Sequence, residues 1–231
     1  MEVSMQVVAR IRSDFKTKFG IPRQSGLVSE LEAAIVFEEP YRDPNAVRGM
    51  EEFSHLWLIW QFSKSLREEW SPTVRPPRLG GNVRVGVFDT RYPYRPNPIG
   101  LSSVKIERID LATPDGPIIT VSGADLLDGT PIYDIKPYLP YTDAHPDARG
   151  GFAYGPEEGR VKVQFPATLS EQLPADRLEE LTALLAQDPR PGYMSDPDRI
   201  YGMDYAGLKV QFTVSDGVLT VVSIGNSPNL R

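Results

Sequence analysis

Residues 100–136 read GLSSVKIERIDLATPDGPIITVSGADLLDGTPIYDIK, and this stretch decides the fold class of the chain. It contains three candidate strands in succession, GLSSVKIERI, PIITVSG and PIYDIK, which are rich in β-branched and aromatic residues. No helical pattern lies between them, whereas a doubly wound sheet needs strands and helices that alternate. The stretch therefore predicts a β-barrel or a curled sheet.

The chain before residue 100 has the same character. Its candidate strands are MQVVARI, AAIVFEE, SHLWLIWQF and VRVGVF. A short helix is expected over Pro44–Glu52, because Asp43 can cap it and Pro44 suits its first turn. Neither a GxGxxG pattern nor a phosphate-binding P-loop is present, so a Rossmann-type site is not indicated. We expect a mainly β fold with a single-sheet barrel over residues 1–150.

A Gly-, Pro- and acid-rich bridge, TDAHPDARGGFAYGPEEG at 142–159, marks the expected domain boundary. After it come a strand, RVKVQF, and a helix around Ala175–Gln187 with leucines on one face. The strands LKVQFTV and VLTVVSI, joined by Ser215-Asp216-Gly217, predict a hairpin. Residues 160–231 should therefore form a small α+β domain of two or three strands and one helix.

Composition excludes several classes of site. The chain has 231 residues, a formal net charge of −6 and no cysteine, which removes thiol nucleophiles, disulfides and Cys-based metal centres. The two histidines, His55 and His145, are too isolated to suggest a metal site, so we expect no metal. No apolar run is long enough to span a bilayer, and the N-terminus lacks the pattern of a secretory signal. We expect a soluble, cytoplasmic protein with no membrane partner.

Residues 72–100, PTVRPPRLGGNVRVGVFDTRYPYRPNPIG, hold five Arg, six Pro and four Gly. Pro fixes φ and Gly permits conformations that other residues avoid, so the segment predicts a shaped loop surface flanking one short strand. Arg in such a loop suits bidentate recognition of phosphate or carboxylate. From Lys64 to Lys105 there are eight basic residues against three acidic ones, and such a face can bind a phosphate backbone. The alternative is an ordinary solvated loop on a mixed surface.

Several motifs together resemble one family. They are FGIPRQSGL (19–27), RGMEEFSHLWLIW (48–60), RPPRLGGN (75–82), RPNPIG (95–100), DGTPIYDIKPYLP (128–140) and QDPRP (187–191). In combination they are similar to the TsaA-like family of tRNA methyltransferases, which methylate N6 of threonylcarbamoyladenosine beside the anticodon with S-adenosylmethionine. The resemblance covers nearly the whole chain. It implies a β-barrel followed by a small α+β domain, a homodimer, tRNA as partner and S-adenosylmethionine as cofactor.

The segment Asp125-Leu126-Leu127-Asp128-Gly129-Thr130 carries the residue types that a nucleoside cofactor needs. Carboxylates can accept from ribose hydroxyls, leucines can pack on adenine, and Gly permits close approach. On spacing alone, a strand end followed by a structural Asp-Gly turn is the stronger interpretation. The resemblance implies instead that all six residues bind the cofactor, together with Pro22, Arg23, Gln24 and Arg91. It also implies Ser63 and Lys64, where some relatives have a His-Gln pair. Leu101 and Ser102 begin a strand whose backbone is expected to face the adenine.

Asn97 stands between two prolines, which restrict its backbone on both sides. Its amide is thus a candidate for hydrogen bonding to a base edge, and the alternative is that Pro-Asn-Pro merely turns the chain.

Asp134 and Lys136 project from one face of a strand, and an ion pair between them is the simplest explanation. The substrate suggests another role, because a carbamoylated N6 is a poor nucleophile and a carboxylate that accepts its proton would help. Asp134 and Asn97 are therefore the catalytic candidates. Arg75, Arg78, Arg95 and Lys136 are candidates for tRNA phosphates or the threonyl carboxylate.

Two other functions remain open from the sequence. One is a non-catalytic RNA- or nucleotide-binding β-barrel, in which the Arg-rich loop binds phosphate and the acidic segment is structural. The other is a different small-molecule enzyme on the same fold. Binding of S-adenosylmethionine distinguishes the leading function from the first of these, because a pure RNA binder has no need of a methyl donor.

Overall fold

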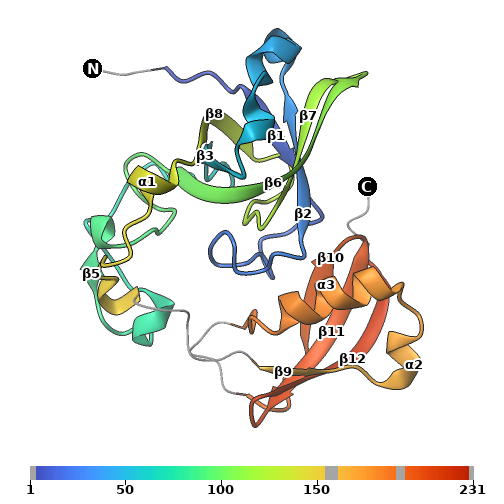
Figure 1. The fold of residues 1–231 in the computed structure, drawn as a ribbon. Helices are drawn as coiled ribbons and strands as arrows, with labels where there is room; N and C mark the ends of the chain where they lie inside the picture. The colour runs from blue at the N-terminus through green and yellow to red at the C-terminus, as the bar shows by residue number, and fades with distance from the viewer. Residues whose placement is uncertain (1–3, 154–160, 191–195, 229–231) are drawn as a thin grey trace.

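The computed structural model describes residues 4–153, 161–190 and 196–228. Its N-terminal part is a closed barrel of antiparallel strands in the order β1-β2-β7-β6-β3-β8 (Figure 1). These strands are β1 (Ala9–Arg12), β2 (Glu32–Phe37), β3 (His55–Gln61), β6 (Ile99–Thr113), β7 (Gly116–Ser122) and β8 (Pro131–Pro137). The mainly β fold with a barrel in front, expected from the sequence, is confirmed.

Alternation along the strands fills the barrel. On β3, Leu56, Leu58 and Trp60 are buried, while the residues between them are only half-buried. The neighbouring strands add fully buried aliphatic side chains, among them Ile11, Ile35, Val104, Ile119 and Ile132. The barrel interior is therefore a packed apolar core, and any binding site must lie outside it or at its rim.

The expected helix over Pro44–Glu52 is not formed. The segment instead contains 3-10 turns, Pro44–Val47 (η2) and Met50–Glu52 (η3), after a first one at Glu39–Tyr41 (η1). Asp43 caps η2 as expected, since its carboxylate accepts from the Asn45 N–H at 2.8 Å. The helix fails because Gly49 has a left-handed φ of 82°, which ends one turn before the next begins.

Residues 62–98, here called the outer segment, leave the barrel between β3 and β6 (Figure 1). They form a two-stranded ladder, β4 (Thr73–Val74) with β5 (Val85–Gly86), and the 3-10 turns η4 (Pro77–Leu79) and η5 (Val87–Asp89). The candidate strand VRVGVF is thus wrong beyond its centre. The Val87 N–H still donates across the ladder to the Pro72 carbonyl at 2.9 Å, but Pro72 has no N–H to donate back, so the ladder ends there and the Thr90 N–H closes a turn onto the Val87 carbonyl.

The outer segment is in contact with the chain that follows β8. That stretch contains α1 (Pro140–Asp143) and η6 (Gly151–Ala153). Arg78 Nη1 donates to the Ala153 carbonyl oxygen at 3.3 Å. The predicted bridge at 142–159 lies partly outside the described residues, so the domain limits stay a prediction.

The C-terminal part is a sheet in the order β10-β11-β12-β9 with a helix on one face (Figure 1). Its elements are β9 (Lys162–Gln164), α2 (Ala167–Ser170), α3 (Ala175–Leu185), β10 (Tyr201–Tyr205), β11 (Leu208–Ser215) and β12 (Val218–Asn226). The helix and the hairpin agree with the sequence prediction, and Asp216 and Gly217 make the turn at φ values of 50° and 74°. Strand β10 was not predicted. It alternates buried Tyr201, Met203 and Tyr205 with less buried residues, but a short run containing Gly and Asp is weak evidence for a strand.

The two parts share a core. Phe15, Val28 and Leu31, from the loop between β1 and β2, are buried with the side chains of α3 and β10–β12. Gly20 in this loop lies so close to β10 that an added Cβ would be 2.2 Å from Met203 Sδ. The loop is therefore held on both sides, by the barrel and by the C-terminal sheet. Within the described residues no helix is long and apolar enough to cross a membrane.

We predict that Gly100→Ala destabilises the protein by about 1–3 kcal/mol, the usual cost of overpacking. A Cβ at Gly100 would be 2.2 Å from the Trp60 ring, and that ring is 6% exposed and cannot move aside freely. The control is Gly225→Ala, also in a strand, where an added Cβ meets no atom within 4 Å. Thermal melts should show a lower Tm for the first variant only, and equal melting temperatures would contradict the close approach.

Candidate functional site

A cavity of about 720 Å³ lies where the β1–β2 loop, the end of β3, the start of β6 and the outer segment meet. Trp60, Phe62, Ile21 and Leu127 supply apolar walls. The cavity is lined by Lys18, Ile21–Gln24, Trp60–Ser65, Phe88, Thr90, Arg91, Pro93, Arg95–Asn97, Ile99–Leu101, Asp125, Leu127 and Thr130. It is large enough for a nucleoside cofactor and combines apolar walls with a few polar groups, as ligand sites usually do.

A chain of hydrogen bonds runs from the barrel core to this cavity. The Trp60 Nε1–H donates to Ser102 Oγ at 2.9 Å, and Ser102 Oγ–H donates to Asp125 Oδ1 at 2.5 Å. Ser102 is fully buried and has one proton, which leaves Asp125 as the acceptor. Burial raises the pKa of Asp125, while the Ser102 bond, the Arg91 charge and the Ser25 backbone N–H act in the opposite direction. The cavity thus contains a carboxylate that is oriented and partly desolvated.

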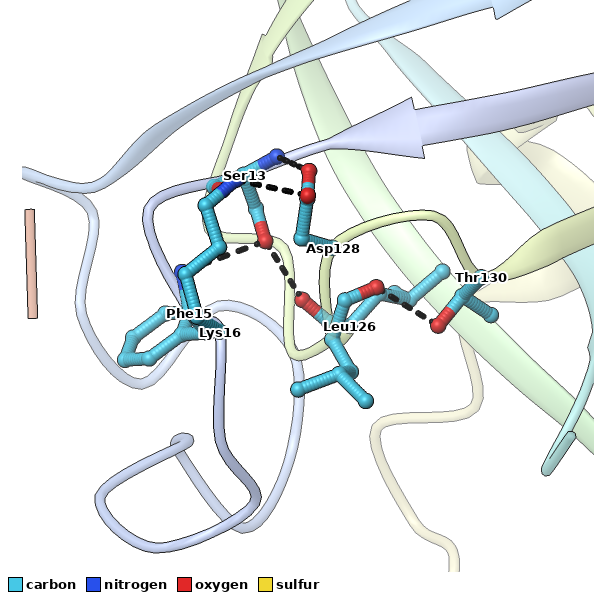
Figure 2. Close-up of polar contacts among 7 residues, drawn as sticks. Ser13, Phe15, Lys16, Leu126, Asp128 and Thr130 are labelled. Atoms are coloured by element: carbon cyan, nitrogen blue, oxygen red, sulfur yellow. Dashed lines mark hydrogen bonds and ion pairs between the residues drawn. The ribbon is translucent and has the colours of Figure 1, made fainter. Parts of the chain in front are cut away.

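The Asp125–Thr130 segment divides into cavity residues and anchoring residues. Figure 2 shows Asp128 against Ser13: its carboxylate accepts from the Ser13 N–H at 3.0 Å and from Lys16 Nζ at 2.6 Å. Ser13 Oγ also donates to the Leu126 carbonyl at 3.0 Å (Figure 2). Leu126 itself is buried in the barrel core. These contacts hold the segment so that Asp125, Leu127 and Thr130 line the cavity.

Cationic side chains also line the cavity, and neighbours hold them in place. Arg91 Nη1 donates to Gln24 Oε1 at 2.7 Å, and Arg95 Nη1 donates to the Thr90 carbonyl at 2.7 Å. Arg23 Nη2 donates to the Arg190 carbonyl at 3.0 Å, and burial lowers the pKa of Arg23. Lys18 Nζ donates to Ser65 Oγ at 2.9 Å and to the Lys64 carbonyl. A carboxylate or phosphate would meet several fixed donors here.

Most of the residues predicted from the sequence meet in this cavity. They are Pro22, Arg23, Gln24, Ser63, Lys64, Arg91, Arg95, Asn97, Leu101, Asp125, Leu127 and Thr130. Leu126, Asp128 and Gly129 belong to the same segment but are not among the lining residues. Gly129 has a φ of 73°, and its carbonyl accepts from Arg10 Nη1 at 3.2 Å. These three residues contact the barrel core and the neighbouring chain, and so hold the segment in place.

Asp134 and Lys136 also lie outside the cavity lining. Lys136 Nζ pairs with Asp134 Oδ2 at 2.7 Å, and both side chains are about half exposed, at 60% and 46%. Ile59 pairs with Asp134 on one side and with the cavity residue Leu101 on the other. Adjacent strands lie about 4.8 Å apart, so Asp134 is about 10 Å from Leu101 across the outer surface of the barrel. Asp134 therefore lies beside the cavity, and one nucleotide could extend from Leu101 to it.

Arg75 and Arg78 lie on the outer segment, away from the cavity lining. Arg75 is exposed, and Arg78 is half-buried against Ala153.

Sequence reasoning missed the aromatic wall and the buried serine. Trp60 and Phe62 lie with ring centroids 4.3 Å apart, and alternation along β3 already places Trp60 on the buried face. Alternation along β6 also distinguishes Ser102 from Ser103, since Ser102 lies on the same buried face as Val104. Phe88 was not predicted as a site residue because it was assigned to the expected strand VRVGVF, whereas it lies on a turn of the outer segment. Within the described residues no group of three His or acidic side chains is arranged to hold a metal ion.

Two family models match the chain. Residues 10–144 match the tRNA-methyltransferase O N-terminal domain, and residues 158–227 match the TrmO C-terminal domain. The chain is 41% identical over 222 residues to the tRNA (adenine(37)-N6)-methyltransferase of Escherichia coli (strain K12), covering 93% of this chain and 94% of that one. It is 38% identical over 144 residues to the probable S-adenosyl-L-methionine-binding protein of Methanothermobacter thermautotrophicus, covering 62% of this chain and 96% of that one.

Solved structures agree with these matches. A crystal structure of TrmO has a TM-score of 0.79 and 34% identity, with 98% of this chain and 100% of that chain covered. A crystal structure of TrmO from Pseudomonas aeruginosa has a TM-score of 0.80 and 34% identity, covering 98% and 99%. With both domain models matched in order along one chain, this protein belongs to the tRNA-methyltransferase O (TrmO) family.

Proposed function

We propose that this protein transfers a methyl group from S-adenosylmethionine to N6 of threonylcarbamoyladenosine at position 37 of tRNA. The observation that carries the proposal is the cavity, in which the Trp60–Ser102–Asp125 chain presents a carboxylate together with fixed cationic groups. Similarity to the tRNA (adenine(37)-N6)-methyltransferase of Escherichia coli (strain K12) supports the choice of substrate. The reaction is assigned to the cytoplasm, where tRNA is modified.

The residues present fit the cofactor. Asp125 can accept from the ribose hydroxyls, since a carboxylate has about four acceptor positions and the Ser102 hydroxyl and the backbone N–H groups of Ser25 and Asp125 do not fill them all. Leu127 and Ile21 supply an apolar surface for adenine, and the backbone at Leu101 is open to the cavity. Arg23 and Arg91 can hold the carboxylate of the amino-acid end. When bound, S-adenosylmethionine supplies an electrophilic methyl group, and no metal is needed for the transfer.

The chain's own residues must orient the adenosine and remove a proton. Asn97 is exposed at the cavity between two prolines, where its amide can hydrogen-bond to the base edge. Asp134 is assigned to accept the N6 proton, because a nucleotide laid across Ile59 spans the distance from Leu101 to Asp134. Arg75, Arg78, Arg95 and Lys136 are assigned to tRNA phosphates or the threonyl carboxylate.

We also propose a homodimer. Ile99 and Leu101 are 39% and 52% exposed on the outside of the barrel, at the edge of the cavity, and a second subunit would cover them. Sedimentation velocity at micromolar concentration checks the state, and a purely monomeric protein contradicts it.

We predict that Asp125→Asn abolishes cofactor binding without harming the fold. Burial raises the pKa of Asp125 in the folded state, so the folded protein holds the proton more tightly than the unfolded chain. The ionised carboxylate therefore destabilises the free protein at neutral pH, and this penalty disappears as the pH falls through the raised pKa. The Asn variant should melt at the wild-type temperature or above it at pH 7, yet show no Tm increase with S-adenosylmethionine.

The matched control is Asp128→Asn, in the same segment but facing Ser13 and Lys16. It should lower the Tm and keep the cofactor-dependent increase. Wild-type heats of binding for Asp125→Asn in calorimetry would remove Asp125 from the site.

We predict that Asp134→Asn lowers the single-turnover methylation rate by about 10²-fold or more, the usual size of general-base catalysis. The amide keeps the shape of the side chain but accepts no proton, so cofactor and tRNA affinities should not change. The substrate is tRNA that already carries threonylcarbamoyladenosine, at saturating concentration, with thermal melts run in parallel.

Lys136→Ala separates catalysis from the ion pair, because it breaks the same pair and leaves the carboxylate in place. Its tRNA affinity should fall, because Lys136 is assigned to a tRNA phosphate or the threonyl carboxylate, but its single-turnover rate at saturating tRNA should stay near wild type, since the carboxylate that accepts the proton is still present. Equal rate losses in both variants, in step with the folded fraction, would show that the pair is only structural.

A further inference from the structure

The outer segment exposes large apolar side chains that the proposed chemistry does not use. Trp70 is 51% exposed and Phe88 is 71% exposed, and their ring centroids lie 6.2 Å apart. Phe88 also lines the cavity. Exposed apolar rings are unfavourable in water, so an exposed aromatic pair next to a cavity indicates a surface that binds a ligand.

The backbone holds this pair in place. The β4–β5 ladder joins Thr73 to Gly86, which brings the chain next to Trp70 close to the chain next to Phe88. Val87 is 1% exposed, and its N–H donates to the Pro72 carbonyl at 2.9 Å. Because Val87 is fixed inward, Phe88 on the same turn projects outward. The exposure of Phe88 is therefore built into the turn.

Guanidinium groups lie among the rings. The Arg95 guanidinium is 5.8 Å from the Phe88 ring centroid, and that of Arg67 is 3.6 Å from the Tyr94 ring centroid. Residues 62–98 contain seven Lys or Arg against three Asp or Glu, in a chain whose net charge is −6. The surface of the outer segment that carries these rings and cations therefore suits a polyanion with flat apolar groups. Unpaired nucleotides have that chemistry, since aromatic rings and Arg planes stack on bases while cations neutralise the backbone.

We propose that Trp70 and Phe88 form a stacking platform for unpaired bases next to the adenosine that enters the cavity. The inference rests on the proposed function and adds to it: the enzyme recognises an open RNA loop, where neighbouring bases can leave the helical stack. Phe88, at the cavity wall, takes the base adjacent to the target, and Trp70 takes a base further out.

The test measures binding of a stem-loop RNA with the sequence of a tRNA anticodon arm, and of a fully paired RNA duplex of equal length. Phe88→Ala and Trp70→Ala should each weaken stem-loop binding by about 5-fold or more, the range found for base–aromatic stacking. Binding of the duplex should not change. Phe88→Tyr retains a ring and should bind the stem-loop almost as wild type does.

Two controls come from the same segment. Val83→Ala removes an apolar side chain that is 51% exposed but has no ring, and it should leave both affinities unchanged. Arg75→Ala removes an exposed cation. It should weaken both RNAs and lower the slope of log K against log salt by about 1, whereas the ring variants should keep the wild-type slope.

Three outcomes would contradict the platform: equal losses of affinity for stem-loop and duplex, an effect of Val83→Ala as large as that of Phe88→Ala, or a shift from dimer to monomer in sedimentation of the ring variants. The last result would make Trp70 and Phe88 part of a subunit contact.

Calorimetry with S-adenosylmethionine on wild-type protein tests the proposed reaction separately. If wild-type protein binds RNA but not S-adenosylmethionine, the proposed reaction is contradicted and the stacking platform is not. If it binds S-adenosylmethionine but the ring variants bind the stem-loop as wild type does, the platform is contradicted and the reaction is not.

Discussion

The contact between the Trp60 indole and the backbone of Gly100 fixes both the barrel and the cavity. The ring lies so close that no side chain is possible at Gly100, and it therefore sets how β3 and β6 pack at their cavity ends. The same indole donates to Ser102, and Ser102 donates to Asp125. One buried aromatic side chain thus links core packing to the orientation of the carboxylate that the proposed ligand meets.

Runs of β-branched and aromatic residues predicted most of the strands, and buried and less buried residues alternate on three of them, β1, β3 and β11. Errors arose where one backbone position overrides a local pattern. Gly49, with its positive φ, divides the expected helix at Pro44–Glu52 into separate turns. Pro72 lies opposite Val87 and has no N–H to extend the ladder, so the last two residues of an apparent strand form a turn instead. Neither event is visible in residue preferences, since both depend on what the chain meets in space.

The site shows the same division between what patterns can and cannot reveal. Motifs brought Pro22–Gln24, Arg91 and Asp125 together correctly, although the residues come from distant parts of the chain. They could not separate Asp125 from Asp128, three residues apart and both acidic, because that choice depends on Ser13 and Lys16 from another loop. Alternation could place Ser102 on the buried face with Val104, but its bond to Asp125 depends on packing between distant segments. Motifs name the segments of a site, and packing decides which atoms face the ligand.

Charge is distributed in this molecule according to what each region must bind. The acidic side chain in the cavity is single, buried and held by neutral donors, which suits hydroxyl groups better than phosphates. The outer segment carries seven of the 25 Lys and Arg residues, and guanidinium groups lie over two of its rings. Arg91 and Arg95 belong to this segment and also line the cavity, so the proposed cofactor and RNA sites meet there. If the proposed platform binds RNA, its phosphate contacts should weaken as salt rises because less is gained from counterion release, whereas stacking on Trp70 and Phe88 should depend less on salt.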